Sequence, residues 1–235
     1  MNFTPSPSAW AAAQPFPHCI IDRFLPEDIL HAAQDRVTKI PWPSWTRYDS
    51  PFERSKSACN EPSVVSFMQC FLNSPEMVKS IETLTGITGL ITDPSLHGGG
   101  FHRTGRGGFL DPHLDYSHHP RLNVERRITL IVYLNPFDLF VGGRLCLYDE
   151  GMNEKLAISP IANRAVLFEN TPNAYHGHPE PLDADARYSF ACFYHTAPRP
   201  ATVPRPRAQF FALPGEAPNP EKDRLRAERA GIVTP

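Results

Sequence analysis

The chain has 235 residues, enough for one well-buried domain with appendages, and its formal net charge of -2 gives no argument for a nucleic-acid or anionic-membrane partner. The first residues lack the basic segment of a signal peptide, and no apolar run approaches the ~20 residues of a membrane span, so we expect a cytoplasmic protein. Five scattered cysteines without Cys-x-x-Cys spacing argue for reduced thiols and against a zinc finger.

Three helices are predicted in the first part of the chain. Residues 24–40 have Pro26 and two acidic residues in the first turn, followed by apolar residues at helical spacing. Residues 73–87 have Ser74 in the N-cap position and Pro75 at the first helical position. Residues 61–72 are predicted to form the remaining helix.

The character of the chain changes near residue 90. Residues 97–110 are rich in glycine and are predicted to interrupt regular structure. Strand-like segments rich in Ile, Val, Leu, Phe and Tyr follow at 127–135, 143–150, 164–170 and 187–196. Because no helices separate these segments, they are predicted to pair antiparallel in a sandwich or jelly roll rather than in a parallel sheet.

These patterns divide the chain into three parts of a single domain. We expect a helical N-terminal part over residues 1–89, a catalytic core over 90–196 and a proline-rich extension over 197–235. The extension is predicted to wrap over the core and to end in a short helix or in disorder. The predicted fold class is mainly β with N-terminal helices, built around a jelly roll.

His113 and Asp115 form the strongest candidate for a metal site. Residues i and i+2 of a strand face the same side, so this pair presents an imidazole beside a carboxylate. A third ligand is available downstream at His176, with His178 as the alternative, and a jelly roll brings that stretch back beside the first pair. Two histidines and one carboxylate on one side of a metal form the facial triad of non-haem Fe(II) enzymes.

At this point the chain resembles the 2-oxoglutarate- and Fe(II)-dependent dioxygenases, on the prolyl-hydroxylase-like branch. The resemblance rests on HLD at 113–115, RRITLIVYLNP around Tyr133, GGRLCLYD from 142, YHGHPEPL from 175 and RYS at 187–189. It implies that the iron ligands are His113, Asp115 and His176. It also implies that Arg187 and Ser189, helped by Tyr133, hold the distal carboxylate of 2-oxoglutarate.

The resemblance further implies the cofactors and the reaction. Fe(II), 2-oxoglutarate and O₂ are the expected cofactor and cosubstrates, ascorbate is a compatible reductant, and hydroxylation of an unactivated C–H bond releases succinate and CO₂. Asp115 supplies a carboxylate where related halogenases have a small residue, so hydroxylation or desaturation is favoured over halogenation. The expected partner is a small-molecule or peptide substrate, with no nucleic acid or membrane, and a homodimer is compatible with the sequence.

Other interpretations of the same residues stay open at the level of sequence. The chain fits a cupin-like isomerase or lyase that needs a metal but no 2-oxoglutarate, or a non-catalytic metal-binding jelly roll. His113 with Asp115 fits a surface strand pair, Arg187 fits a surface salt bridge, and Tyr133 fits ordinary core packing. Residues 42–56 fit either a lid over the substrate or a loop packed on the sandwich.

Overall fold

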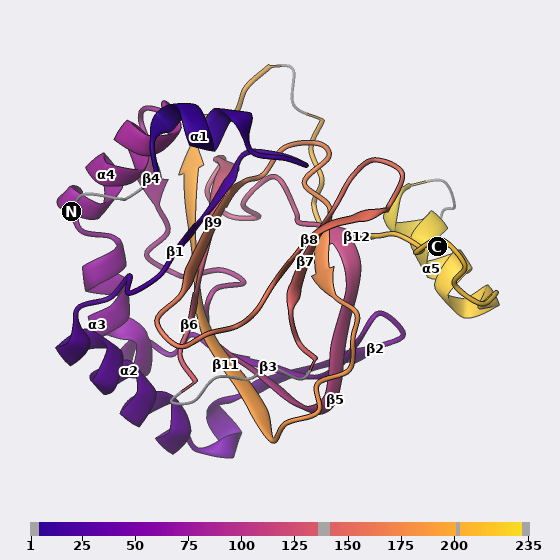
Figure 1. Cartoon of the computed structure of the whole chain (residues 1–235), viewed down its shortest axis with the longest axis horizontal. Coiled ribbons are helices and arrows are strands. Elements are labelled where there is room, and N and C mark those ends of the chain that lie inside the picture. The colour runs from indigo at the N-terminus through magenta and orange to yellow at the C-terminus, as the bar shows by residue number, and fades with distance from the viewer. Residues whose placement is uncertain (1–4, 136–141, 201–202, 232–235) are drawn as a thin grey trace.

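The computed structural model describes residues 5–135, 142–200 and 203–231, and within them the strands form one strongly curved antiparallel sheet (Figure 1). Its main path runs in the order β1-β9-β6-β11-β5-β10-β7-β8, and β3, β4 and β12 pair alongside β5 and β11. The strands are β1 (His18–Ile21), β2 (Thr46–Ser50), β3 (Glu53–Cys59), β4 (Ile91–Thr92), β5 (Gly100–Leu114), β6 (Glu125–Tyr133), β7 (Leu145–Tyr148), β8 (Glu154–Ile158), β9 (Ala165–Glu169), β10 (His176–His178), β11 (Ala186–Thr196) and β12 (Gln209–Phe210). The expected jelly roll with N-terminal helices is confirmed.

The helices lie on two sides of this sheet. Helices α1 to α4 form a layer on one flank, and α5 lies on the opposite side near the C-terminus (Figure 1). Their bounds are α1 (Pro7–Ala12), α2 (Glu27–Lys39), α3 (Pro62–Leu72), α4 (Pro75–Thr85) and α5 (Pro220–Arg229). None of the helices in the described ranges has the length and apolar character needed to cross a membrane.

All three predicted helices are present, as α2, α3 and α4, and the starts of α2 and α4 match local sequence signals. Helix α2 starts directly after Pro26, and α4 starts after Ser74, whose hydroxyl accepts a hydrogen bond from the amide of Met77 at 3.2 Å. Helix α4 ends at Gly86, which has the left-handed conformation that glycine adopts without strain. Local signals therefore set these ends, as the sequence indicates.

The prediction for the glycine-rich segment is wrong, because residues 100–114 form the longest strand, β5. Its first half pairs with β11 and its second half with β10, so the strand turns from one part of the sheet to the other. Gly107 has a positive φ of 70° at this turn. A Cβ on Gly100 would lie 2.3 Å from the carbonyl oxygen of Cys59 on the neighbouring strand. The glycines thus permit the bend and the close approach rather than ending the strand.

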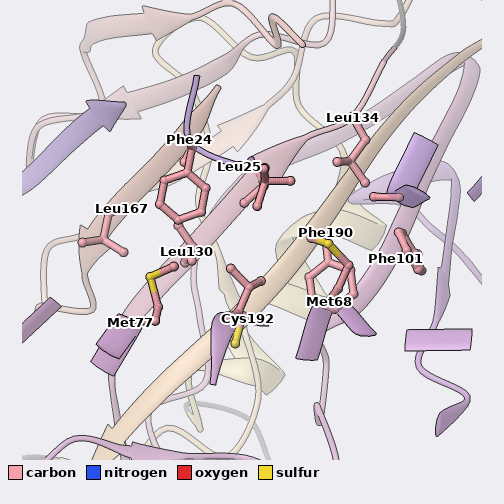
Figure 2. Packing of buried hydrophobic residues seen from close by; sticks show 14 of the residues in the cluster. Phe24, Leu25, Met68, Met77, Phe101, Leu130, Leu134, Leu167, Phe190 and Cys192 are labelled. Atoms are coloured by element: carbon pink, nitrogen blue, oxygen red, sulfur yellow. The ribbon is translucent and has the colours of Figure 1, made fainter. Parts of the chain in front are cut away.

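Strands β6 and β11 separate the packed core from the interior of the curved sheet. On each strand alternate residues face the helices, and among them Leu130, Phe190 and Cys192 pack against Met68 and Met77 of α3 and α4 (Figure 2). The residues between them face the opposite side, as the two-residue period of a strand requires. That opposite side lines the cavity of the molecule, and its polar residues include Thr129, Arg187 and Ser189.

The proposed division of the chain at residues 89 and 196 follows the order of the sequence, whereas the sheet contains strands from all three parts. The first part contributes β1, β2 and β3 to the sheet in addition to its helices, and the hairpin of β2 and β3 occupies much of the segment 42–56. The extension contributes β12, which pairs with β5, and ends in helix α5. We retain the three-part division as a proposal.

Candidate active site

His113, Asp115 and His176 converge at one end of the cavity inside the sheet. His113 lies on β5 and is the direct cross-strand neighbour of His176 on β10. Asp115 follows the end of β5, with its Oδ1 3.5 Å from Nε2 of His113 and its Oδ2 3.8 Å from Nε2 of His176. One potential ligand atom from each residue lies within 4.8 Å of the other two. The side chains that the sequence placed together are therefore together in the structure.

Backbone carbonyl groups hold both imidazole rings. Nδ1 of His113 lies 3.0 Å from the carbonyl oxygen of Asp111, and Nδ1 of His176 lies 2.9 Å from that of Ala174. A carbonyl oxygen can only accept, so each Nδ1 carries the proton and each Nε2 presents its lone pair to the site. Burial, together with His113 nearby, lowers the pKa of His176 to about 4. Both features prepare the pair to bind a cation.

Arg126 holds the carboxylate between the two histidines. Burial alone would raise the pKa of Asp115, but the positive charge of Arg126 is the strongest opposing influence, and the pKa lies well below its usual range. Nη1 of Arg126 lies 3.2 Å from Oδ2 of Asp115, and its guanidinium lies 3.2 Å from the centroid of the Phe193 ring. Asp115 is therefore ionised, and one of its oxygens is already engaged by a fixed cation.

Arg187, Ser189 and Tyr133 lie together in the same cavity. Arg187 and Ser189 lie two residues apart on β11 and therefore face the same side. Ser189 is the cross-strand neighbour of Tyr133 on β6. The Arg187 guanidinium is 5.6 Å from the centroid of the Tyr133 ring, and its Nη1 donates to the carbonyl oxygen of Gly143 at 2.6 Å. Nε of Arg187 and the hydroxyl of Tyr133 are buried without a partner among the described residues. These unpaired donors suit a carboxylate.

Three basic side chains, those of His102, His178 and Lys56, lie near Arg187, and of these only His178 is singled out in the sequence, as the alternative metal ligand. Both ring nitrogens of His178 and Nε2 of His102 are buried without a partner within the described ranges. Burial, with Lys56 and Arg187 nearby, lowers the pKa of His102 to about 3. Lys56 bonds to Glu53 at 3.3 Å, yet burial still lowers its pKa. His102 and Lys56 were missed, because His102 lies on the glycine-rich strand β5 and Lys56 lies on the polar strand β3.

The cavity has a volume of about 280 Å³. Its wall includes residues of the β2–β3 hairpin and of the C-terminal extension, among them Tyr48, Phe210 and Arg229. Phe210 is the cross-strand neighbour of His113, and their ring centroids are 5.5 Å apart. No pattern in the sequence indicates that the extension lies beside the metal-binding candidates.

Residues 99–195 match the family model described as "2OG-Fe(II) oxygenase superfamily". Over these residues, which include all six predicted site residues, the chain is similar to this superfamily. The protein is an oxygenase that uses Fe(II) and 2-oxoglutarate. No curated protein matches the chain.

Solved structures resemble the oxygenase in fold. A prolyl-4-hydroxylase from Pseudomonas putida has a TM-score of 0.61 at 17% identity, covering 81% of this chain and 98% of that chain. A Trichoplax adhaerens prolyl hydroxylase, solved with a peptide fragment of hypoxia inducible factor, has a TM-score of 0.52 at 19% identity, covering 76% and 83%. HygX from Streptomyces hygroscopicus, solved with nickel and 2-oxoglutarate, has a TM-score of 0.55 at 12% identity, covering 77% and 85%. The fold of the prolyl-hydroxylase-like branch, expected from the sequence, is confirmed.

The residues that line the cavity fit both Fe(II) and 2-oxoglutarate. The set of two imidazole nitrogens and one carboxylate oxygen suits Fe(II), because three protein ligands would leave other coordination positions for the cosubstrate and O₂. The unpaired Nε of Arg187 and hydroxyl of Tyr133 suit a carboxylate of the cosubstrate. His178 is not part of the three-residue group found in the described part of the chain, so the geometry favours His176.

Proposed function

We propose that His113, Asp115 and His176 bind Fe(II), and that the oxygenase hydroxylates an unactivated C–H bond of an amino acid, a prolyl peptide or a small biosynthetic intermediate. The observation that carries this proposal is the convergence of the three ligand atoms within 4.8 Å beside the cavity. Arg187, Ser189 and Tyr133 bind the distal carboxylate of 2-oxoglutarate in the same proposal.

Iron and 2-oxoglutarate supply the oxidising chemistry: one atom of O₂ enters the substrate as a hydroxyl group, and the other enters succinate as CO₂ leaves. The chain's own residues set the geometry. The carbonyl groups of Asp111 and Ala174 fix the two imidazole rings, and Arg126 fixes the carboxylate of Asp115. The walls of the cavity exclude water and orient the C–H bond that reacts.

The size of the cavity favours a small substrate. Pockets for drug-sized ligands are about 300–1,000 Å³, and this cavity of about 280 Å³ must also hold 2-oxoglutarate. Phe210 of β12 and residues of the β2–β3 hairpin form part of its wall. A free amino acid or another molecule of that size fits the remaining space better than a folded protein segment does.

The proposal is tested by measuring succinate formed from 2-oxoglutarate with and without Fe(II). Asp115→Ala should abolish the Fe(II)-dependent succinate, because the variant loses a ligand rather than a core residue. The matched control is Asp35→Ala, which removes a surface carboxylate paired with Lys39 on α2 and should leave succinate formation unchanged. Fe(II)-dependent succinate formation by Asp115→Ala at the wild-type rate would refute the ligand assignment.

A further inference from the structure

Four cationic side chains line the cavity, and two of them have no acidic partner. Lys56 pairs with Glu53, and Arg126 pairs with Asp115. Arg187 and Arg229 form no ion pair with any residue in the described ranges; each donates one hydrogen bond to a backbone carbonyl oxygen. The proposed function assigns Arg187 to the binding of 2-oxoglutarate. It assigns no ligand to Arg229.

Arg229 belongs to a part of the chain that lies outside the residues matched to the family model. It is the last residue of α5, and its Nη1 donates to the carbonyl oxygen of Ala208 at 3.2 Å. Its guanidinium lies 5.0 Å from the ring centroid of Phe210, and the Phe210 ring is 5.5 Å from that of His113. A single aromatic ring therefore separates Arg229 from a proposed iron ligand.

Ion pairs hold α5 in this position. Lys222 lies 2.6 Å from Oδ2 of Asp111, two residues before His113 on β5. Arg226 and Lys222 both pair with Glu216. Because these three contacts use the other cations on this face of the helix, Arg229 stays available while its backbone is held.

The charges of the loaded cavity also leave two positive charges uncompensated. The lining side chains carry four positive charges, on Lys56, Arg126, Arg187 and Arg229, against two negative charges, on Glu53 and Asp115. Fe(II) and the 2-oxoglutarate dianion cancel each other, so a net positive charge remains on the wall. Since a partly buried cation without a counter-ion is unfavourable, an anionic ligand group is the chemistry that this wall accommodates.

We propose that Arg229 binds an oxyanion of the substrate, a carboxylate or a phosphate, so that the substrate of this oxygenase is a small anionic molecule. This inference rests on the proposed function. The planar guanidinium offers two parallel donors to such a group, while Phe210 supports its face. The anion fixes one end of the substrate on α5 and leaves its C–H bond directed at the metal-binding residues.

The test compares anionic compounds with neutral partners as stimulants of succinate formation by the loaded enzyme. One arm uses the free L-amino acids against their primary amides, and the other uses sugar phosphates against the parent sugars. At least one anionic compound should stimulate turnover while its neutral partner does not, and the arm in which it lies identifies the anion. Arg229→Gln should raise KM for that compound by about tenfold to a hundredfold, the loss of a charged hydrogen bond, with a smaller change in kcat.

Two further variants keep the test decisive. Arg229→Lys keeps the charge but loses the planar fork, so its KM should lie between those of wild type and Arg229→Gln; it also serves if the glutamine variant does not fold. Arg224→Gln changes an exposed arginine of the same helix, paired with Glu228, and should leave KM unchanged.

Three results would overturn the inference: stimulation by a neutral partner as strong as by the anion, no stimulation by any anionic compound, or an unchanged KM in Arg229→Gln. The basal Fe(II)-dependent formation of succinate separates this failure from that of the proposed function. If wild type forms succinate from 2-oxoglutarate alone, only the assignment of Arg229 fails. If it forms none, the proposed function itself fails.

Discussion

Arg187→Ala is the substitution whose effect the structure defines most completely. The side chain is 8% exposed, its pKa is lowered by burial, and it has no acidic partner among the described residues. Losing a charged hydrogen bond costs about 1.5–3 kcal/mol, which corresponds to a Kd for 2-oxoglutarate raised by about 10- to 150-fold. The ligand-free protein should change less, because the variant loses the bond to Gly143 but also loses a buried cation without a counter-ion.

The two effects separate in unfolding measurements made with and without 2-oxoglutarate, using Mn(II) in place of Fe(II). A ligand at 100 times its Kd stabilises the wild type by about 2.7 kcal/mol, and a 30-fold weaker Kd reduces this to below about 1 kcal/mol at the same concentration. Arg144→Ala is the control, because this exposed arginine pairs with Glu180 close to Gly143. Equal stabilisation of Arg187→Ala and wild type would refute the assignment of the carboxylate anchor.

Three other predictions follow from single positions. His176→Ala should lose bound iron while His178→Ala retains it, measured as iron per chain after desalting; equal retention contradicts the ligand choice. Gly100→Ala should lower the free energy of unfolding by about 1–3 kcal/mol more than Gly107→Ala in urea, because both have positive φ but only Gly100 has a neighbouring backbone oxygen in the way. Burial lowers the pKa of His195 to about 4 from 6.5, so the unfolded chain takes up the extra proton between these values, and stability present above pH 6.5 is lost as pH falls. His195→Leu should reduce this loss at pH 5 by about 1–2 kcal/mol, and an unchanged pH dependence would contradict it.

The site candidates could be predicted where side-chain spacing and strand geometry agree. His113 with Asp115, and Arg187 with Ser189, are pairs at i and i+2, so a strand places each pair on one face whatever the rest of the fold. The order of strands then brings β10 beside β5. His176 and His113 consequently lie directly across from each other, as a jelly roll requires.

The residues that were missed lie on elements without a hydrophobic pattern. Strands β2 and β3 are polar on both sides, so Lys56 gave no strand signal, and β10 is only three residues long. Helix α5 has no apolar stripe and is fixed by ion pairs such as that of Lys222 with Asp111, which no local pattern predicts. His119 follows β5 without any pattern that indicates burial, yet it is buried, with Nε2 3.2 Å from Oδ2 of Asp93.

The most direct test of the central claim is anaerobic visible spectroscopy. Fe(II) is added to the metal-free protein, followed by 2-oxoglutarate, and the charge-transfer band of the chelate is recorded for wild type and for His113→Ala. The account predicts a band in wild type that is absent from the variant. A wild-type protein that binds iron yet gives no band on addition of 2-oxoglutarate, or a variant that keeps the full band, would contradict it.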